Sequence, residues 1–105
     1  MNHKYSALFF IAIFVTLRLA AQKNQDKFSF SGNILAATTN LPLAGATVYI
    51  ADLKKGGVAN SAGHFQINNI PYGTYLAEIR FVGYKSVLKN ISFNKNIDEN
   101  YALDI

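Results

Sequence analysis

Residues 70–84 read IPYGTYLAEIRFVGY, and this stretch decides the fold that the sequence predicts. The residues at 75, 77, 79 and 81 are apolar or aromatic, and they alternate with those at 74, 76, 78 and 80, three of which are polar. A period of two is typical of a strand with one buried side and one solvent-facing side. Pro71 and Gly73 predict a turn before this strand, and Gly83 ends it. The stretch therefore predicts a long central strand bounded by tight turns.

The same alternation occurs on both sides of this stretch. Between the alternating segments, Gly, Pro, Asn and Ser predict turns at residues 38–42, 55–57, 60–63 and 94–96. No sustained apolar repeat of 3.6 residues occurs after residue 21. Short strands with a turn about every ten residues predict an all-β sandwich of about seven strands. The further strand segments are 28–34, 46–50, 65–67, 87–93 and 101–105.

The N-terminus predicts export. A short polar segment with Lys4 precedes an apolar run over residues 7–17, which is too short to span a bilayer as a helix. We expect a signal peptide helix over residues 1–21, cut after Ala21, then a polar lead over 22–27 and one domain over 28–105. The alternatives are a membrane anchor or a buried N-terminal helix. Lipid anchoring at a cysteine is excluded, since the chain has none.

Composition excludes several classes of function. With 105 residues the chain has room for one domain, and without cysteine it has no disulfide, thiol nucleophile or cysteine-ligated zinc. The net charge is +4, but only Lys54 and Lys55 are adjacent among the lysines. A nucleic-acid site needs basic residues clustered with stacking aromatics. We therefore expect no nucleic-acid partner.

Catalytic chemistry has few candidates. His64 is the one histidine after the predicted cut, and a Ser-His-Asp site would have to join it to a carboxylate such as Asp52 and to Ser61, Ser86 or Ser92. We expect His64 to be exposed, since it faces the side opposite Phe65. Zinc needs three or four ligands, which one histidine without cysteine does not supply. We predict no catalytic residue, no metal and no cofactor.

Three tyrosines are the candidate binding residues. Tyr49, Tyr72 and Tyr84 occupy predicted turn or solvent-facing positions. An exposed tyrosine can stack on a sugar or anchor a protein partner. The alternative is that Tyr84 packs on the edge of the sandwich and Tyr49 covers a sheet face. An edge strand that adds a partner's strand is a second route to interaction.

Five short motifs follow one another along the chain, at residues 32–34, 42–48, 56–65, 70–75 and 83–84. With these motifs in this order, the chain resembles the carboxypeptidase regulatory-like domain, a prealbumin-type β-sandwich. The resemblance implies a small Ig-like or prealbumin-like sandwich. Asn60 stands where the family commonly has aspartate, and both residues cap turns.

The resemblance also implies a role. It is to the accessory module beside carboxypeptidases, not to their zinc-bearing catalytic domain. Behind a signal peptide, such a domain is typical of the N-terminal extension of TonB-dependent outer-membrane receptors, in which a plug and a barrel follow. We expect a non-catalytic protein of the periplasm or outer membrane, with a protein partner in the cell envelope. A free-standing domain that binds a glycan or protein is the alternative. The end at Ile105 fits a truncated receptor, a separately encoded domain or a reading frame ended early.

Overall fold

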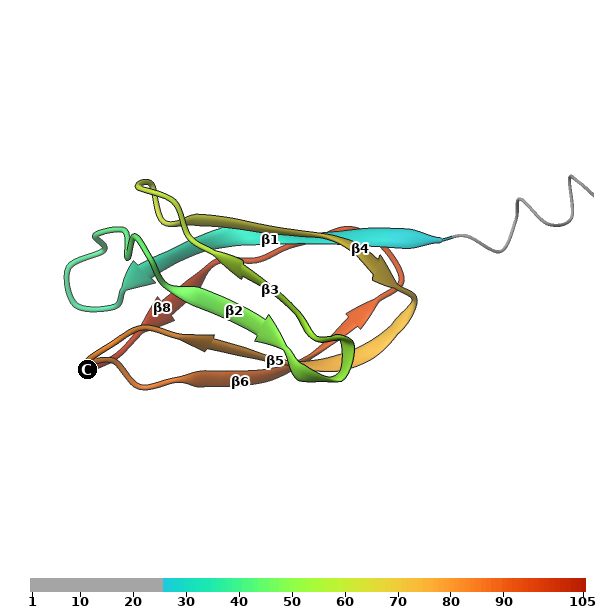
Figure 1. Cartoon of the computed structure of the whole chain (residues 1–105). Coiled ribbons are helices and arrows are strands. Elements are labelled where there is room, and N and C mark those ends of the chain that lie inside the picture. Colours follow the sequence, from blue (N-terminus) through green and yellow to red (C-terminus); the bar gives the residue numbers. More distant parts are fainter. Residues whose placement is uncertain (1–25) are drawn as a thin grey trace, which may run out of the picture.

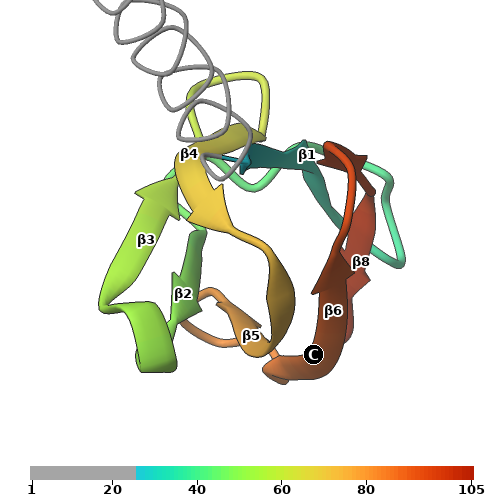
Figure 2. The same ribbon diagram turned by 90° about the vertical axis from the view of Figure 1, so that its right-hand side faces the viewer.

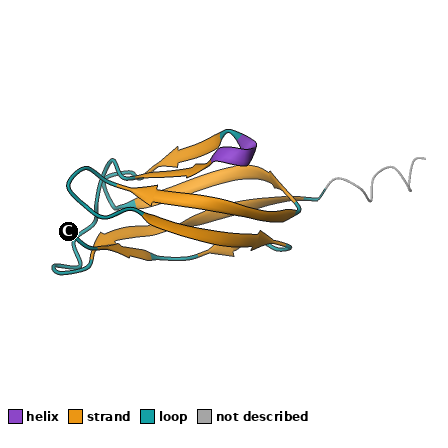
Figure 3. Cartoon of the chain, turned by 90° about the horizontal axis from the view of Figure 1, so that it is seen from below, coloured by secondary structure: helices purple, strands orange, loops and turns teal. Residues whose placement is uncertain are grey.

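The structure, a computed structural model, describes residues 26–105, and they form a sandwich of two β-sheets (Figures 1 and 3). The all-β sandwich expected from the alternation is confirmed, with eight strands in place of about seven. The predicted signal peptide over residues 1–21 lies outside the described residues. The strands are β1 (Lys27–Ala36), β2 (Thr47–Ile50), β3 (Lys55–Val58), β4 (His64–Pro71), β5 (Gly73–Arg80), β6 (Val87–Phe93), β7 (Ile97–Asp98) and β8 (Tyr101–Leu103).

The first sheet is built around β1. Strand β4 pairs antiparallel with one edge of β1. Strands β7 and β8 both pair parallel with the other edge, β7 opposite Phe30 and Ser31 and β8 opposite residues 34–36. In Figure 2, β1 and β4 lie at the top of the sandwich, and β2 and β5 of the other sheet lie below them. The C-terminal segment therefore covers the length of β1 with two short strands.

The second sheet has the order β3-β2-β5-β6, with every pair antiparallel. The central strand expected from residues 70–84 is confirmed as β5. The turn predicted over 55–57 is wrong, because these residues belong to β3 and pair with β2. The reversal occurs earlier, in the 3₁₀ turn η1 (Ala51–Leu53) and at Lys54, whose φ is +51°. Glycine is uncommon in strands, and here pairing with β2 overrides that preference.

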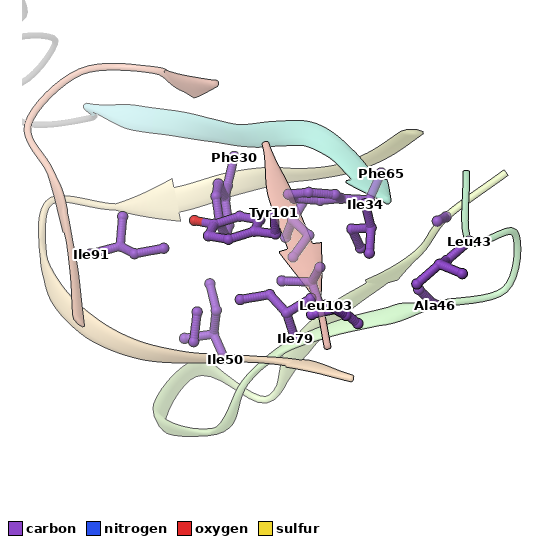
Figure 4. Close-up of a cluster of buried hydrophobic side chains, with 14 of the residues drawn as sticks. Phe30, Ile34, Leu43, Ala46, Ile50, Phe65, Ile79, Ile91, Tyr101 and Leu103 are labelled. Atoms are coloured by element: carbon purple, nitrogen blue, oxygen red, sulfur yellow. The ribbon is translucent and has the colours of Figure 1, made fainter. Parts of the chain in front are cut away.

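The core fills the space between the two sheets (Figure 4). The Phe30 ring meets Phe65, Phe93 and Tyr101 edge-on, with centroid distances of 5.0, 5.6 and 6.3 Å. Edge-to-face pairs add to the free energy of burial because a positive ring edge meets a negative ring face. The expected alternation ends at Leu103, since Ile105 is 74% exposed and not buried.

The turn over residues 60–63 forms as the sequence predicts. The Asn60 side-chain oxygen accepts hydrogen bonds from the backbone N–H groups of Ala62 and His64, at 2.9 and 3.1 Å. The Asn60 carbonyl accepts a third from Gly63 at 2.9 Å. This turn reverses the chain and places Phe65 in the core.

Candidate interaction surface

The outer face of the second sheet carries large apolar side chains on all four of its strands. Val58 on β3 is 65% exposed, Tyr49 on β2 is 44% exposed, and Leu76 on β5 and Leu88 on β6 are 46% and 62% exposed. Such a patch marks an interaction site more often than isolated exposed residues do. We call this surface the β2–β5 face and define it by Thr47, Tyr49, Gly56, Val58, Leu76, Glu78, Arg80 and Leu88.

Registers place these residues, with the exception of Leu76, in two rows across the sheet. In the first row, Tyr49 pairs with Gly56 on one side and with Glu78 on the other, and Glu78 pairs with Leu88. In the second row, Thr47 pairs with Val58 and with Arg80. Cross-strand partners point to the same side of a sheet, so each row forms a line of neighbouring side chains.

The charges of the β2–β5 face are one carboxylate and one guanidinium. Arg80 Nη1 lies 3.7 Å from Glu78 Oε1, and both side chains are well exposed. The two residues lie two positions apart on β5, so their side chains are on the same face of the sheet. An exposed pair at this distance stabilises the fold little. The two side chains are therefore free to meet charges of a partner, and the face as a whole is neutral.

Hollows lie between these side chains. One of about 500 Å³ is lined by both rows, from Gly56 and Val58 to Glu78 and Arg80. It lies beside Tyr49 because Gly56 has no side chain there. A second, of about 410 Å³, shares Thr47 and Arg80 with the first and extends to the turn after β5. The β2–β5 face thus has both protruding side chains and depressions that can receive them.

The three candidate tyrosines do not gather on one surface. Tyr49 belongs to the β2–β5 face. Tyr72 is 70% exposed in the turn before β5, and Tyr84 lies in the turn after β5, so the length of that strand separates them. Tyr84 is half-buried, with its ring 5.8 Å from that of Phe81. Of the three, Tyr49 alone lies beside the large hollow.

The outer face of the first sheet has a different character. Its outward positions on the described strands carry mainly polar side chains, and its exposed residues include no large apolar side chain. The exceptions are Leu35, which is half-buried, and its partner Ala102. Exposed polar side chains keep a sheet face solvated. The polar positions are Ser29, Ser31, Asn33, His64, Gln66, Asn68 and Asp98.

His64 lies on this polar face, and the expectation that it is exposed is wrong. It is half-buried, because Asn33 stands opposite it on β1 and places its Oδ1 3.2 Å from His64 Nδ1. The hydrogen bonds that the structure gives His64 run to Asn33 and Asn60, not to the candidate serines or to Asp52. Ser92 Oγ instead lies 2.9 Å from Thr74 Oγ1 on β5. Within residues 26–105, the residues that a Ser-His-Asp site would have to use are not brought together.

A polar cluster joins the two sheets at the β6 edge. Glu99 Oε2 accepts hydrogen bonds from Lys89 Nζ at 2.9 Å and from the Tyr101 hydroxyl at 2.8 Å. The hydrogen bonds from Lys89 and Tyr101 lower the pKa of the Glu99 carboxyl. Burial and the bond to Glu99 raise the pKa of Tyr101. The three side chains satisfy one another's hydrogen-bonding groups, which is typical of polar side chains that stabilise a fold.

Residues 26–105 bring no three His, Cys, Asp or Glu side chains into a group that could hold a metal ion. In that same range, no helix has the length and hydropathy that a membrane crossing requires.

Sequence reasoning missed most of the β2–β5 face. It identified Tyr49 but not Val58, Leu76, Leu88 or the role of Arg80. An available signal was Leu76, an apolar residue at the solvent-facing phase of an alternating strand. Val58 was hidden, since the two glycines before it were interpreted as a turn.

Comparison with known proteins supports the family resemblance. The family model of the CarboxypepD_reg-like domain matches residues 30–104, which confirms the resemblance seen in the motifs. A comparison with curated proteins found no match.

Solved structures share the fold. One similar chain comes from a C-terminal interface mutant of the type II Cohesin-X-Dockerin complex of Acetivibrio cellulolyticus, with 28% identity and a TM-score of 0.60. Another comes from an N-terminal interface mutant of that complex, with 28% identity and a TM-score of 0.59. Each match covers 70% of this chain and 52% of the other, so the chain spans about half the length of the structures it matches.

Proposed function

Because the chain belongs to the CarboxypepD_reg-like domain family, we propose that it is a non-catalytic, exported accessory domain that binds a protein partner in the cell envelope. The observation that carries this proposal is the β2–β5 face. It is an exposed, neutral surface with apolar side chains on four strands, on a sandwich whose other outer face is polar. The similar solved chains, which come from protein–protein complexes, support it.

The finer form of the proposal concerns location. Residues 1–21 act as a signal peptide, and the domain is the N-terminal extension of a TonB-dependent outer-membrane receptor for nutrient uptake. It then works on the periplasmic side, where it assists assembly or regulation of uptake. The apolar run over residues 7–17 and the family membership of the residues behind it support this form.

Fractionation of the source cells tests the location. Peptides between residues 28 and 80 are identified by mass spectrometry in each fraction, with the mass of the species that carries them. We expect them in a large outer-membrane species. A small periplasmic species that begins at Gln22 would support export but contradict the receptor form. Peptides from residues 1–21 in a mature cytoplasmic protein would contradict both.

Substitutions on the two faces test the interaction. Leu88→Arg places a charge on the β2–β5 face, and Gln66→Arg places the same charge on the polar outer face of the first sheet. Both positions are exposed, so we expect both variants to fold. Cross-linking in the cell envelope should lose its partner adduct with Leu88→Arg and keep it with Gln66→Arg. Equal adducts from both variants would contradict the proposal.

One observation favours a glycan as a second candidate ligand. The half-exposed Tyr49 ring borders a hollow whose polar groups are Thr47, Glu78 and Arg80. A ring face beside side chains that can hydrogen-bond to hydroxyl groups suits a sugar. A glycan array with the wild-type chain and Tyr49→Ala tests this alternative. Binding that is lost with Tyr49→Ala would favour the glycan over the protein partner.

A further inference from the structure

We propose that the partner of the β2–β5 face is a second copy of this chain, packed face to face around a twofold axis. The inference rests on the proposed function, since it names the occupant of the same surface. What carries it is that the two rows of the face complement each other. Where one row has a large or negative side chain, the other has a small or positive one on the same strand.

The complementarity follows from the registers. On β2, the first row has Tyr49 and the second has Thr47. On β3, the first row has Gly56 and the second has Val58. On β5, the first row has Glu78 and the second has Arg80. Within the two rows, each of these three strands therefore presents an unlike pair.

A twofold axis between the rows uses this pattern. If the axis lies parallel to the sheet and perpendicular to its strands, each row of one copy faces the other row of its partner. Tyr49 then lies over Thr47 of the second copy, Val58 over Gly56, and Glu78 beside Arg80. Each contact occurs twice, as an isologous interface requires. Face-to-face sheets keep their strands within about 30° of each other, which this arrangement allows.

Shape and charge agree with this arrangement. Val58 protrudes from the face, with 65% of its surface exposed, and a hollow of about 500 Å³ lies over Gly56 beside it. The rotation brings each Val58 to the other copy's hollow. Glu78 and Arg80 form a long intramolecular contact of 3.7 Å, so they can exchange partners between copies. The exchange replaces two weak exposed pairs with two that the interface partly desolvates, where they are stronger.

Apolar residues beyond the rows extend the contact. Leu76 is 46% exposed two positions before Glu78 on β5, and Val82 is 92% exposed two positions after Arg80. Val82 lies in the turn after β5, where it lines the second hollow together with Thr47 and Arg80. Leu76 and Val82 therefore add apolar surface on either side of the two rows. Leu88 adds apolar surface at the β6 edge.

A charge-reversal pair tests the geometry. Glu78→Arg leaves two arginines on the face of one variant, and Arg80→Glu leaves two glutamates on the face of the other. Two copies of the same variant then bring like charges together at both contacts. In an equimolar mixture, one copy of each variant can pair, and this pair brings opposite charges together at both contacts. Neither variant keeps an intramolecular pair, so restored association in the mixture reports contact between copies.

The measurement is sedimentation equilibrium of the purified protein, obtained by expressing the full chain. We expect the wild type to dimerise, and each variant alone to associate at least about tenfold more weakly, because like charges face each other across the interface. The equimolar mixture should regain dimers, as should the single chain that carries both substitutions. Circular dichroism confirms that each variant is folded.

Matched controls place the same charge changes elsewhere. Asp98→Arg and Lys27→Glu alter exposed residues of the first sheet, and both should dimerise as the wild type does. A wild type that stays monomeric up to about 1 mM, a binding energy of roughly −4 kcal/mol, would overturn the inference. So would a mixture that stays monomeric. If the wild type is monomeric and Leu88→Arg still loses its envelope adduct, the proposed function stands and the second copy is not the partner.

Discussion

Gly63 shows how closely one residue is constrained by the chain around it. Its φ is +77°, a conformation that residues with a side chain rarely adopt. A Cβ at this position would lie 2.7 Å from the Ile34 carbonyl oxygen and 2.9 Å from Pro42 Cβ. Gly83 has a similar φ of +85°, but nothing lies within 4 Å of a Cβ there. The two glycines thus separate the cost of backbone conformation from the cost of a clash.

We expect Gly63→Ala to be the more damaging of the two substitutions. Gly83→Ala should lower the free energy of unfolding by about 1 kcal/mol, the cost of a left-handed conformation. Gly63→Ala should lower it by about 1–3 kcal/mol more, because the neighbouring chain must also move. Urea denaturation followed by circular dichroism measures both. Equal losses would mean that the turn absorbs the added methyl group without strain.

The Glu99 cluster predicts how stability depends on pH. The pKa of Glu99 is lowered from its usual value of 4.5 by hydrogen bonds from Lys89 and Tyr101. When pH falls below about 4.5, the unfolded state takes up the proton first, so stability is lost as pH falls through the folded-state pKa. The pKa of Tyr101 is raised above its usual value of 10. The stability that the Tyr101 hydroxyl contributes is therefore complete below pH 10 and is lost as the pH rises further.

We therefore expect the free energy of unfolding to be highest between about pH 5 and pH 10. Glu99→Gln should flatten the acidic side of the profile, and Tyr101→Phe should flatten the alkaline side. Urea denaturation at a series of pH values measures both slopes. An unchanged acidic slope in Glu99→Gln would mean that other carboxylates cause the acid loss.

Among the structural elements, the C-terminal segment depends on side chains that complete a β-ladder. Between β7 and β8, and before β7, asparagine side chains replace backbone partners of β1. Asn96 Oδ1 accepts from the Ser29 N–H, and Asn100 Oδ1 accepts from the Asn33 N–H, each at 3.0 Å. Glu99 N–H donates to the Ser31 carbonyl between them. The ladder along β1 is thus continuous although β7 and β8 are short.

Loss of one asparagine should loosen this edge. We expect Asn100→Ala to lower the free energy of unfolding by about 1 kcal/mol, the usual contribution of one hydrogen bond. The Asn33 amide should also exchange faster with solvent, since its acceptor is gone. Hydrogen exchange measured by NMR gives the second result directly. Asn90→Ala, at an exposed position of β6, is the control and should leave the Asn33 amide protected.

These elements also show which parts of the fold the sequence could predict. Strands with a clear period of two, such as β5, were predicted with their turns, because alternation follows directly from burial on one side. Strand β3 was not predicted, because its two glycines favour a turn. It forms a strand because it pairs with β2, which lies elsewhere in the sequence. The side-chain hydrogen bonds of Asn96 and Asn100 were also missed, since the backbone N–H groups that donate to them lie 67 residues away along the chain.

For the candidate site, the sequence could supply residues but not their arrangement. Tyr49 was identified because an exposed tyrosine is a recognisable anchor. Its neighbours Gly56 and Glu78 come from other strands, and pairing alone brings them together. The separation of Tyr72 from Tyr84 likewise follows from the length of β5, which local patterns did not connect to binding.

The whole molecule combines a polar outer face, a shared core and a neutral apolar outer face. An isolated sandwich gains nothing from exposing Tyr49, Val58, Leu76 and Leu88 on one sheet while keeping the opposite sheet polar. This asymmetry is typical of a domain that buries one side in an assembly. If the β2–β5 face is buried against another copy, folding and association are linked. The stability of each chain then depends on the protein concentration.

We therefore expect the midpoint of thermal unfolding to rise with protein concentration. When dimers dominate, free monomer grows with the square root of total protein, so a tenfold increase stabilises each chain by about 0.7 kcal/mol. For a domain of this size that corresponds to roughly 3–5 °C. Differential scanning calorimetry over a hundredfold range of concentration measures the shift. Glu78→Arg should show a smaller shift over the same range, because its monomers associate more weakly. A wild-type midpoint independent of concentration would mean that the β2–β5 face stays open to another partner.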